Sequence, residues 1–590
     1  IQRISSNDYL SYWDSFDKVV YVENNYELAL LASTYASLIN APLIIQGTNY
    51  DSQNVFSNRK IICVGNVNPT GSSCNEQYNL EQLQRKYVDE TGTDKIMLVN
   101  PNDLDIKVIN DVESFFSKDF TKSSGIINEI YSGTSLAAPI LASAKQELIL
   151  TINSPNYEFV DQKLKSSITN YHIVPNYLTI FATPDAVQQT QIGLKYLEEW
   201  VNEDDRVEVD NHIYGDLDGD FFQELAVGRI YGITISDVSS YVGRDLFYDE
   251  LPHSNDFAVL WAPDFPNMIS AGKTIDKLLS ATGMNERSVY ATNDGGPKMF
   301  NPKNDFENKA LIAYLDHGSW NGGSLGYTTP DLANNDVHFD STVVISNACS
   351  VNAYDKITED SPKHMFFGGQ LIRRGALAHF AAVEDAGLNA DLAKTVVEQI
   401  AQGYNNGMAL RNVRNLIVPE PIFEFDPFYV LLGDPTFNLN LNRPTNLEEI
   451  KIETDTDSKI IKILWPSISA GIKFDFGNKN VKKSEGELFF NHFSTNLLRD
   501  YYLKDYRYYE NGELKHSEEV FQASTTLVTP LDMAINSINE IEIRSLSFNK
   551  LLKCANNPWG SVVCVEDPDN LIAREESVYP LLTRDNKGND

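Results

Sequence analysis

A histidine and a cysteine each follow a short apolar run in the middle of the chain. The run LIAYL, residues 311–315, leads into Asp-His-Gly-Ser, which contains His317, and the run VVI, residues 343–345, leads into Ser-Asn-Ala-Cys-Ser, which contains Cys349. Each run has the length and composition of a buried strand. Ligands of open α/β sheets bind at the carboxyl ends of the strands. If the two strands are parallel neighbours, a thiol and an imidazole share one crevice, as a nucleophile and its base do.

This pair of motifs resembles the gingipain family of caspase-like cysteine peptidases. The segments DLDGDFFQELAVGRI (216–230) and YVLLGDPTF (429–437) are similar to stretches that flank the catalytic part in that family, and the resemblance covers roughly residues 170–440. It implies an α/β fold with a caspase-like parallel sheet flanked by helices. It also implies a cysteine endopeptidase in which Cys349 attacks as a thiolate and His317 supports the thiolate or protonates the leaving amine. The backbone amides of Cys349 and Gly318 are then the oxyanion donors.

The partner of the histidine stays open at this level. Asp316 is adjacent, but neighbouring side chains of a strand point to opposite faces. Asp264, Asp294 and Glu359 are further candidates for a carboxylate that orients the ring. Taken singly, a cysteine at a strand end is often a small buried hydrophobe and a histidine is often a turn residue. The catalytic interpretation depends on the two occurring together.

Three residues near these strands are candidates for substrate binding. Glu384 and Asp385 follow the strand after Cys349, where the resemblance implies a pocket wall, and acidic groups there would bind Arg or Lys of a substrate. Solvated loop charges are the alternative in so acidic a chain. Trp320 either packs against substrate or covers the sheet edge.

A cluster of carboxylates predicts a cation site ahead of the catalytic part. Asp216, Asp218 and Asp220 alternate around Gly219, and Glu224 follows. Such a loop of hard oxygen ligands suits a structural Ca²⁺, although it is shorter than an EF-hand and lacks the Glu at the twelfth position. A plain solvated turn is the alternative. No cofactor is expected for catalysis itself.

Composition restricts the classes of partner and compartment. The formal net charge of −34 argues against nucleic acid and favours attraction of basic ligands, while a salty habitat is another explanation. No run of eighteen apolar residues exists, so no membrane-spanning helix is expected. The chain begins at Ile1, which fits removal of a signal peptide. We therefore expect a secreted or cell-surface protein acting on proteins or peptides, with attachment to the cell surface as an option.

The spacing of the cysteines also indicates a secreted protein. Cys63 with Cys74 and Cys554 with Cys564 form two close pairs in loop-like surroundings, which leaves Cys349 over. Two short-loop disulfides are typical of a secreted protein. Four ordinary reduced thiols are the alternative.

The order of strand-like and helix-like runs along the chain predicts three domains. Residues 1–169 alternate strand-like and helix-like runs, as in an α/β module, with a loose likeness to modules of prokaryotic cell-wall-binding and surface-layer proteins. Residues 170–443 are the gingipain-like part. Residues 444–590 carry short strand-like runs after a polar linker, which indicates an immunoglobulin-like β-sandwich and a tail.

A second motif resembles a hydrolase site but does not indicate one. Residues 133–139, Gly-Thr-Ser-Leu-Ala-Ala-Pro, look like the serine motif of subtilases, but no histidine precedes His172. We expect a helix start instead, with Thr134 or Ser135 as the N-cap.

Two other functions compete with an endopeptidase. A sortase-like transpeptidase would use an amine in place of water as the acyl acceptor. A non-catalytic surface-layer or adhesion protein on the same fold would explain the N-terminal module and the acidic surface.

Overall fold

The computed structural model divides the chain into two compact units. One contains Ile1–Val108, Ile130–Gln188 and Gly232–Leu246, and the other contains Ile109–Glu129, Gln189–Tyr231 and Phe247–Asp590. The structure describes residues 6–105, 107–110, 128–131, 133–184, 186–188, 190–191, 208–209, 214–218, 223–232, 235–262, 266–291, 302–323, 328–353, 366–383, 391–401, 403–417 and 429–441, together with the backbone of the strands after residue 450. Each unit is described by itself.

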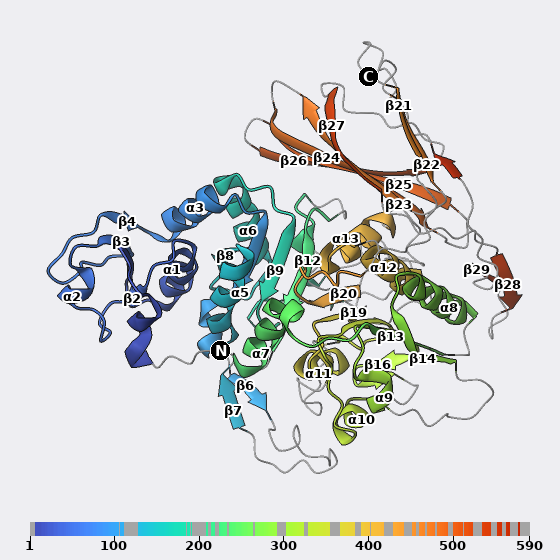
Figure 1. The fold of residues 1–590 in the computed structure, drawn as a ribbon, viewed down its shortest axis with the longest axis horizontal. Helices are drawn as coiled ribbons and strands as arrows, with labels where there is room; N and C mark the ends of the chain where they lie inside the picture. The colour runs from blue at the N-terminus through green and yellow to red at the C-terminus, as the bar shows by residue number, and fades with distance from the viewer. Residues whose placement is uncertain are drawn as a thin grey trace. The chain divides into compact units, whose positions relative to one another are not determined.

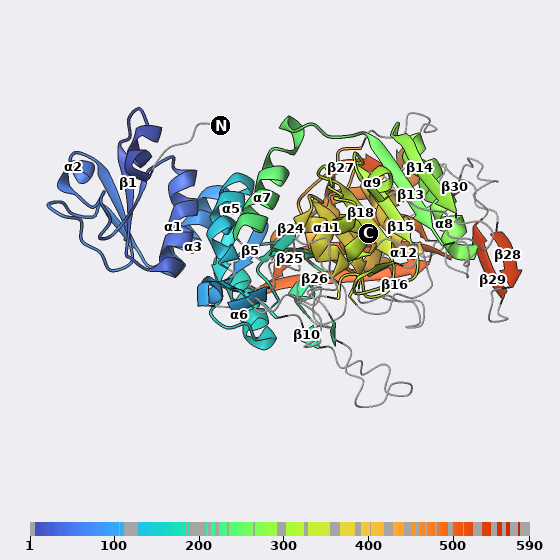
Figure 2. The same ribbon diagram turned by 90° about the horizontal axis from the view of Figure 1, so that it is seen from below.

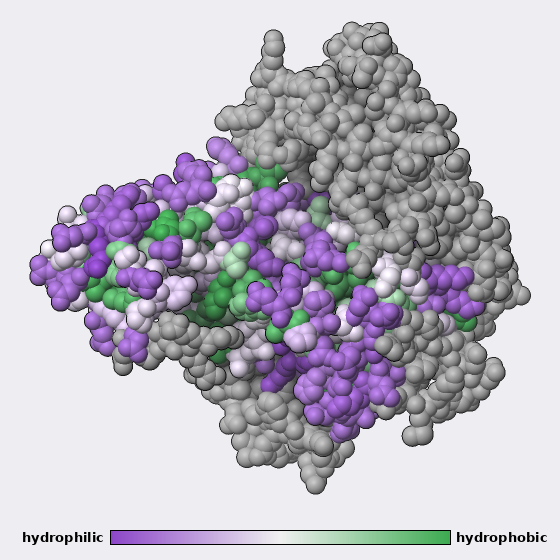
Figure 3. Space-filling model, viewed as in Figure 1, coloured by the Kyte–Doolittle hydropathy of each residue, from purple (hydrophilic) through white to green (hydrophobic). Residues whose placement is uncertain are grey.

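The first unit begins with a small sheet of four parallel strands. Its order is β2-β1-β3-β4, with β1 (Lys18–Val22), β2 (Leu43–Ile45), β3 (Lys60–Val64) and β4 (Glu76–Tyr78). The connecting helices are α1 (Tyr26–Leu38), α2 (Gln53–Phe56) and α3 (Leu80–Thr91). Asn79 and Gln82 close a capping box at the start of α3, which satisfies backbone donors that the first turn leaves open. Figure 3 shows a mostly hydrophilic surface over these elements, drawn at the left, with small separate hydrophobic patches, as the acidic composition leads one to expect.

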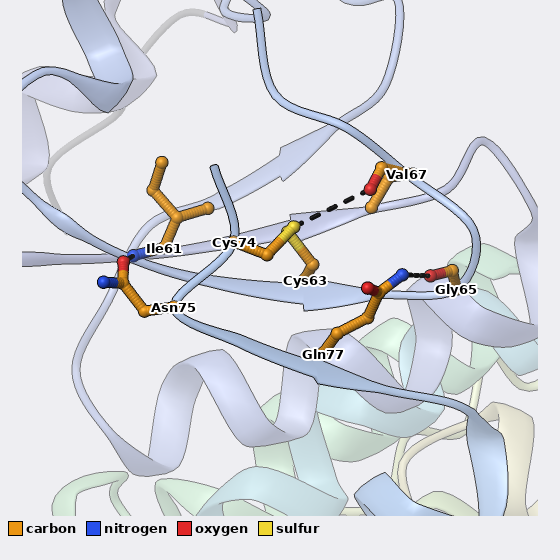
Figure 4. The surroundings of a disulfide bond; sticks show 7 residues. All are labelled: Ile61, Cys63, Gly65, Val67, Cys74, Asn75 and Gln77. Carbon is orange, nitrogen blue, oxygen red and sulfur yellow. Dashed lines mark hydrogen bonds between the residues drawn. A yellow bond between two sulfur atoms is a disulfide. The ribbon is translucent and has the colours of Figure 1, made fainter. Parts of the chain in front are cut away.

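One of the two expected disulfides lies in this sheet. Cys63 of β3 is bonded to Cys74, eleven residues later, just before β4 (Figure 4). The side-chain carbonyl of Asn75 accepts a hydrogen bond from the backbone N–H of Ile61 at 2.7 Å, and the Gln77 amide donates to the carbonyl of Gly65 at 3.1 Å. Cys63 belongs to the apolar core of the sheet, so the bond ties the connection before β4 directly to that core.

Removing this disulfide should destabilise the first unit. Closing a loop of this length restricts the unfolded chain, and the double variant Cys63→Ala, Cys74→Ala should lose about 2–4 kcal/mol of local unfolding free energy. Hydrogen exchange of the β1 and β3 amides measures that loss, with Cys349→Ala as the control that leaves these amides unchanged. Equal protection in the parent and the double variant would contradict the prediction.

The first unit also contains a second group of parallel strands. β5 (Lys95–Val99) lies between β8 (Leu148–Thr151) and β9 (Tyr177–Phe181) and is parallel to both. Helices α5 (Ala138–Lys145), α6 (Tyr157–Tyr171) and α7 (Ile235–Leu246) accompany them. α5 and α7 lie side by side (Figures 1 and 2). The Lys145 ammonium of α5 pairs with the buried Asp245 carboxylate of α7 at 3.1 Å. The predicted N-terminal module, residues 1–169, stays a prediction as a domain.

A larger, mostly parallel sheet forms the centre of the second unit. The order of its strands is β14-β13-β15-β18-β19-β20-β12. They are β12 (Ala226–Ile230), β13 (Asp256–Trp261), β14 (Asn285–Ala291), β15 (Leu311–Leu315), β18 (Val343–Asn347), β19 (Ala378–Ala382) and β20 (Tyr429–Gly433). Every pair from β14 to β19 is parallel, β20 is antiparallel to β19, and β12 is parallel to β20. The described side chains of β15, β18, β19 and β20 are all buried, and these strands are apolar except for Ser346, Asn347 and His379.

Helices flank this sheet, as predicted for an α/β fold. α8 (Pro266–Ala281), α12 (Asp391–Ala401) and α13 (Asn406–Ile417) pack against one another and against the strands, while α11 (Phe367–Arg373) contacts β19 and β20 from the other side (Figure 1). Short helices α9 (Pro302–Phe306) and α10 (Thr329–Asn334) precede β15 and β18. The parallel sheet flanked by helices that was expected is therefore confirmed.

The residues after 450 form antiparallel strands. A three-stranded sheet contains β21 (Lys451–Asp455), β22 (Ile460–Trp465) and β30 (Glu576–Val578), and β28 (Leu552–Asn556) pairs with β29 (Val562–Glu566). A five-stranded sheet contains β23 (Ser469–Gly477), β24 (Val481–Phe493), β25 (Arg499–Glu510), β26 (Glu513–Gln522) and β27 (Ala534–Ile543). Their packing into a sandwich stays a prediction. Among the described residues, no helix has the length and apolar character needed to cross a membrane.

Candidate active site

The two strands that precede His317 and Cys349 are parallel neighbours. Leu315 of β15 is in register with Asn347 of β18, and the backbone N–H of Asp316 donates to the Asn347 carbonyl at 3.0 Å. His317 and Cys349 therefore each lie two residues beyond the same rung of the ladder, at the carboxyl edge of the sheet. His317 is exposed and Cys349 is half-buried, so both are accessible from this edge.

Glycine at position 318 brings the two segments into backbone contact. A Cβ atom built on Gly318 would lie 2.5 Å from the carbonyl oxygen of Cys349 and 2.8 Å from its nitrogen. Atoms cannot approach so closely, so any larger residue would push the histidine segment away from the cysteine segment. The structure thus brings together three of the predicted site residues, His317, Gly318 and Cys349.

A short hairpin that the sequence did not reveal follows the histidine. β16 (Gly318–Ser319) pairs with β17 (Gly322–Gly323), and Trp320 lies in the turn between them with 37% of its surface exposed. The Trp320 carbonyl accepts a hydrogen bond from the backbone N–H of Phe367, at the start of α11, at 2.8 Å. Gly323 lies against the Tyr314 hydroxyl, where a Cβ atom would come within 1.7 Å. The hairpin is therefore held at its turn, where Trp320 lies, and at the end of β17.

Asp316 belongs to the buried side of β15. Its carboxylate is 1% exposed and accepts a hydrogen bond from the Tyr314 hydroxyl at 2.8 Å. This bond joins the side chains of Tyr314, within β15, and Asp316, directly after it. The carboxylate that orients His317 stays a prediction. The other proposed partners, Asp264, Asp294 and Glu359, lie outside the described residues.

The turn after the cysteine is strained and closely held. Ser350 has a φ of +55°, in the left-handed region, which costs a residue with a side chain on the order of 1–2 kcal/mol. The Val351 carbonyl accepts from the Gly368 N–H at 2.9 Å, and the Asn352 N–H donates to the Ala382 carbonyl at 2.9 Å. These bonds attach the turn to α11 and to β19, so surrounding structure maintains the strained conformation that follows Cys349.

Comparison with known proteins places this edge of the sheet in a peptidase. The model of peptidase family C25 matches residues 154–440, which include His317, Gly318 and Cys349. This segment is a gingipain-like cysteine peptidase domain. The family expected from the motifs is thereby confirmed, and the C25 domain is a cysteine endopeptidase whose substrates are proteins or peptides.

Solved structures with detectable likeness are distant. The chain aligns with the Arg-specific cysteine proteinase gingipain R at 12% identity and a TM-score of 0.43, covering 81% of this chain and 98% of that one. It aligns with another protease structure at 12% identity and a TM-score of 0.41, covering 73% and 97%. A separase–securin complex from Saccharomyces cerevisiae aligns at 11% identity and a TM-score of 0.29, covering 55% and 22%. No curated protein sequence matches the chain.

Three of the four predicted metal ligands of the C25 domain lie together. Carboxylate oxygens of Asp216, Asp218 and Glu224 are within 4.8 Å of one another, with Asp216 and Glu224 buried and Asp218 exposed. Glu224 Oε2 also accepts the backbone N–H of Leu217 at 2.5 Å, which closes the loop on itself. The donor set consists of hard oxygens and fits Ca²⁺. Asp220 lies outside the described residues.

The structure does not describe the side chains of the remaining predicted site residues. Glu384 and Asp385 lie outside the described residues, but β19, which they follow, is the parallel neighbour of β18. Cys554 and Cys564 are directly opposite in the β28–β29 pair. Their side chains are not among those described, so their disulfide stays a prediction.

The subtilase-like motif near residue 135 was predicted to start a helix through a Thr134 or Ser135 cap. A short 3₁₀ helix, Thr134–Ala137, precedes α5, and its N-cap is Gly133 without a side-chain cap bond, so the predicted cap is wrong. Ser135 Oγ donates instead to the buried carboxylate of Asp103 at 2.5 Å, and Thr134 Oγ1 donates to it at 3.0 Å. The Tyr26 hydroxyl lies 2.8 Å from Ser135 Oγ. These contacts connect α1 and the 3₁₀ helix before α5 to the segment that follows β5, which is a structural role.

Proposed function

We propose that Cys349 is the nucleophile and His317 the acid–base group of this endopeptidase. The observation that supports this most strongly is the contact between Gly318 and the Cys349 backbone, because it fixes the two segments at one edge of the sheet. Cys349 is also outside any disulfide, whereas Cys63 and Cys74 are joined to each other.

The chemistry proceeds as acyl transfer in two stages. The Cys349 thiolate adds to the scissile carbonyl carbon, and the backbone N–H groups of Cys349 and Gly318 receive the oxyanion. His317 protonates the amine as the C–N bond breaks, which leaves a thioester on Cys349. A water molecule, losing its proton to His317, then attacks the thioester, and the carboxylic acid product and free thiol return.

The same proposal includes cleavage after a basic residue. The acidic pair Glu384 and Asp385 follows β19 in sequence, and the carboxyl edge of β19 adjoins that of β18, the strand that precedes Cys349. Carboxylates there would hold the Arg or Lys side chain through charge-assisted hydrogen bonds. The exposed ring of Trp320 offers an apolar surface for an adjacent substrate residue. Secretion, with or without attachment to the cell surface, is part of the proposal and is supported by the Cys63–Cys74 disulfide.

Labelling and a substrate panel test this assignment together. Iodoacetamide under non-reducing conditions should alkylate Cys349 and abolish hydrolysis, and peptide amides with Arg or Lys before the scissile bond should be cleaved faster than those with Asp or Asn. Hydrolysis that survives complete alkylation of Cys349 would reject the nucleophile. Preference for Asp or Asn would reject the basic pocket alone. An amine added to the reaction and found in the product would reassign the enzyme as a transpeptidase.

We also propose that Asp216, Asp218 and Glu224 bind a structural Ca²⁺ that holds the loop ahead of β12. Asp216→Asn and Glu224→Gln should each weaken calcium binding by at least about tenfold, because each removes a charged ligand. In the parent protein, calcium at a hundred times its Kd should add about 2.7 kcal/mol of stability. Isothermal titration and thermal unfolding measure these effects, with the exposed Asp249→Asn as the control. Unchanged binding in both ligand variants would contradict the site.

A further inference from the structure

A buried histidine links the two ends of the segment that contains Cys349. His379 lies on β19 and is completely buried. Its Nε2 is 2.8 Å from the Ser346 hydroxyl, and its Nδ1 is 2.8 Å from Asn352 Oδ1. Ser346 precedes Cys349 by three residues and Asn352 follows it by three. One imidazole therefore contacts both sides of the turn that presents the thiol.

The hydrogen-bond partners determine which form of the ring is present. Asn352 Oδ1 can only accept, so Nδ1 carries the proton, and Nε2 accepts from the Ser346 hydroxyl. The Asn352 amide nitrogen lies 3.5 Å from the carbonyl of Ala381, which agrees with this orientation of the amide. Burial lowers the pKa of His379 to about 3, so the imidazole stays neutral from weakly acidic to alkaline pH.

Ser346, His379 and Asn352 repeat the contact pattern of a serine hydrolase triad, but they are not a second catalytic centre. Ser346 and Asn352 are 0% exposed, as is His379, so no substrate carbonyl can reach the hydroxyl. The group acts through the elements that it joins.

The surroundings leave the cluster little freedom to move. A Cβ atom on Gly368 would lie 1.8 Å from Asn352 Oδ1 and 2.6 Å from His379 Nδ1, so the first turn of α11 closes directly over the pair. Phe367 packs its ring edge-on to the imidazole, with 6.2 Å between the centroids. The backbone N–H groups at the start of α11 also donate hydrogen bonds to the carbonyls of Trp320 and Val351. A shift of His379 would therefore displace both the β16–β17 hairpin that follows His317 and the turn that follows Cys349.

We propose that His379 is a positioning residue that fixes the Cys349 turn through its hydrogen bonds to Ser346 and Asn352. The proposal depends on Cys349 being the nucleophile. Ser350, next to Cys349, has a left-handed backbone that relaxes unless both ends of the turn are held. His379 holds one end through the end of β18 and the other through Asn352.

Four variants test this role. His379→Leu removes both hydrogen bonds. His379→Asn retains a donor near the Nδ1 position and can still reach Asn352, and Ser346→Ala removes the other contact without changing the histidine. Phe380→Leu is the matched control, because Phe380 is equally buried on β19 but points to the opposite face of the sheet.

The readouts are kcat and KM on one peptide amide, the rate constant of iodoacetamide labelling at Cys349, and the melting temperature. His379→Leu should lower kcat by about 10- to 100-fold with KM changed less than about threefold, because the nucleophile is misplaced while the substrate surface remains. Ser346→Ala should lower kcat by about three- to tenfold, and His379→Asn should recover most of the loss. Phe380→Leu should lower the melting temperature without this selective loss of kcat.

Equal kcat in His379→Leu and Phe380→Leu at matched melting temperatures would overturn the proposal. If His379→Leu does not fold, unchanged kcat in Ser346→Ala together with unchanged labelling would overturn it as well. Failure of the proposed function is recognised separately, because Cys349→Ala would then remain active whatever the His379 variants do.

Discussion

Replacing Cys349 by alanine should reduce kcat/KM for peptide cleavage by at least about 10⁴-fold, to the limit of detection. The variant has no nucleophile to form the thioester, and removal of one member of a catalytic group typically costs as much as removal of all. The change is small and Cys349 is half-buried, so the free energy of unfolding should change by less than about 1 kcal/mol. Activity on the preferred peptide amide and thermal unfolding are measured on the same preparation.

Controls for this loss are available within the chain. Cys349→Ser keeps the shape of the side chain but offers a hydroxyl of much higher pKa, so it should lose nearly as much activity as the alanine variant. The Cys63→Ala, Cys74→Ala variant should retain kcat, because neither residue lies in the C25 domain. Cleavage by Cys349→Ala at a tenth of the parental rate or above would remove this cysteine from the mechanism.

The strands of both units were the most predictable features. The runs KVVYV, KIICV, KIMLV and LIAYL correspond residue for residue to β1, β3, β5 and β15. Strands buried on both faces are mostly apolar, and polar residues mark their ends, so the pattern shows directly in sequence. Parallel pairing of β15 and β18, which was only a condition in the sequence argument, is observed.

The supporting contacts of the site were not predictable in the same way. The hairpin of β16 and β17 has two residues in each strand, which is too short to show a period. Ser346 and His379 are 33 residues apart, and their contact depends on the register in which Val344 faces His379 across the β18–β19 pair. A histidine inside the apolar run ALAHFAA was the only available signal, because a buried polar side chain needs partners, but it did not indicate which ones.

The incorrect helix cap has a similar cause. Thr134 and Ser135 are typical capping residues, and local pattern favoured them. Their hydroxyls bond the buried Asp103 carboxylate, 31 and 32 residues away. Such a buried acceptor must be satisfied by nearby donors, and that requirement outweighs the small local gain from a cap.

Gly318→Ala should lower kcat/KM by about 10²- to 10³-fold, the second largest effect expected here, because a misplacement of about 1 Å can cost a factor of that size. The added methyl group would meet the Cys349 carbonyl oxygen at 2.5 Å, the Ala348 Cβ at 2.8 Å and the Cys349 nitrogen at 2.8 Å. Two of these atoms are backbone and cannot rotate away, so the segments that contain His317 and Cys349 must separate. Steady-state kinetics and denaturant unfolding measure the result, with a stability loss of about 1–3 kcal/mol from the overpacked contact.

Gly243→Ala is the matched control for that experiment. Gly243 lies within α7, and no atom comes within 4 Å of an added Cβ. The control should keep full activity and gain up to about 1 kcal/mol, since alanine favours a helix interior over glycine. The separation of the two segments also predicts which kinetic constant changes in Gly318→Ala: kcat should carry most of the loss, because the nucleophile and its acid–base partner move apart while the more distant substrate contacts remain. A loss confined to KM would mean that the methyl group blocks substrate instead, and Gly318 would then line the binding cleft rather than set the spacing of the catalytic pair.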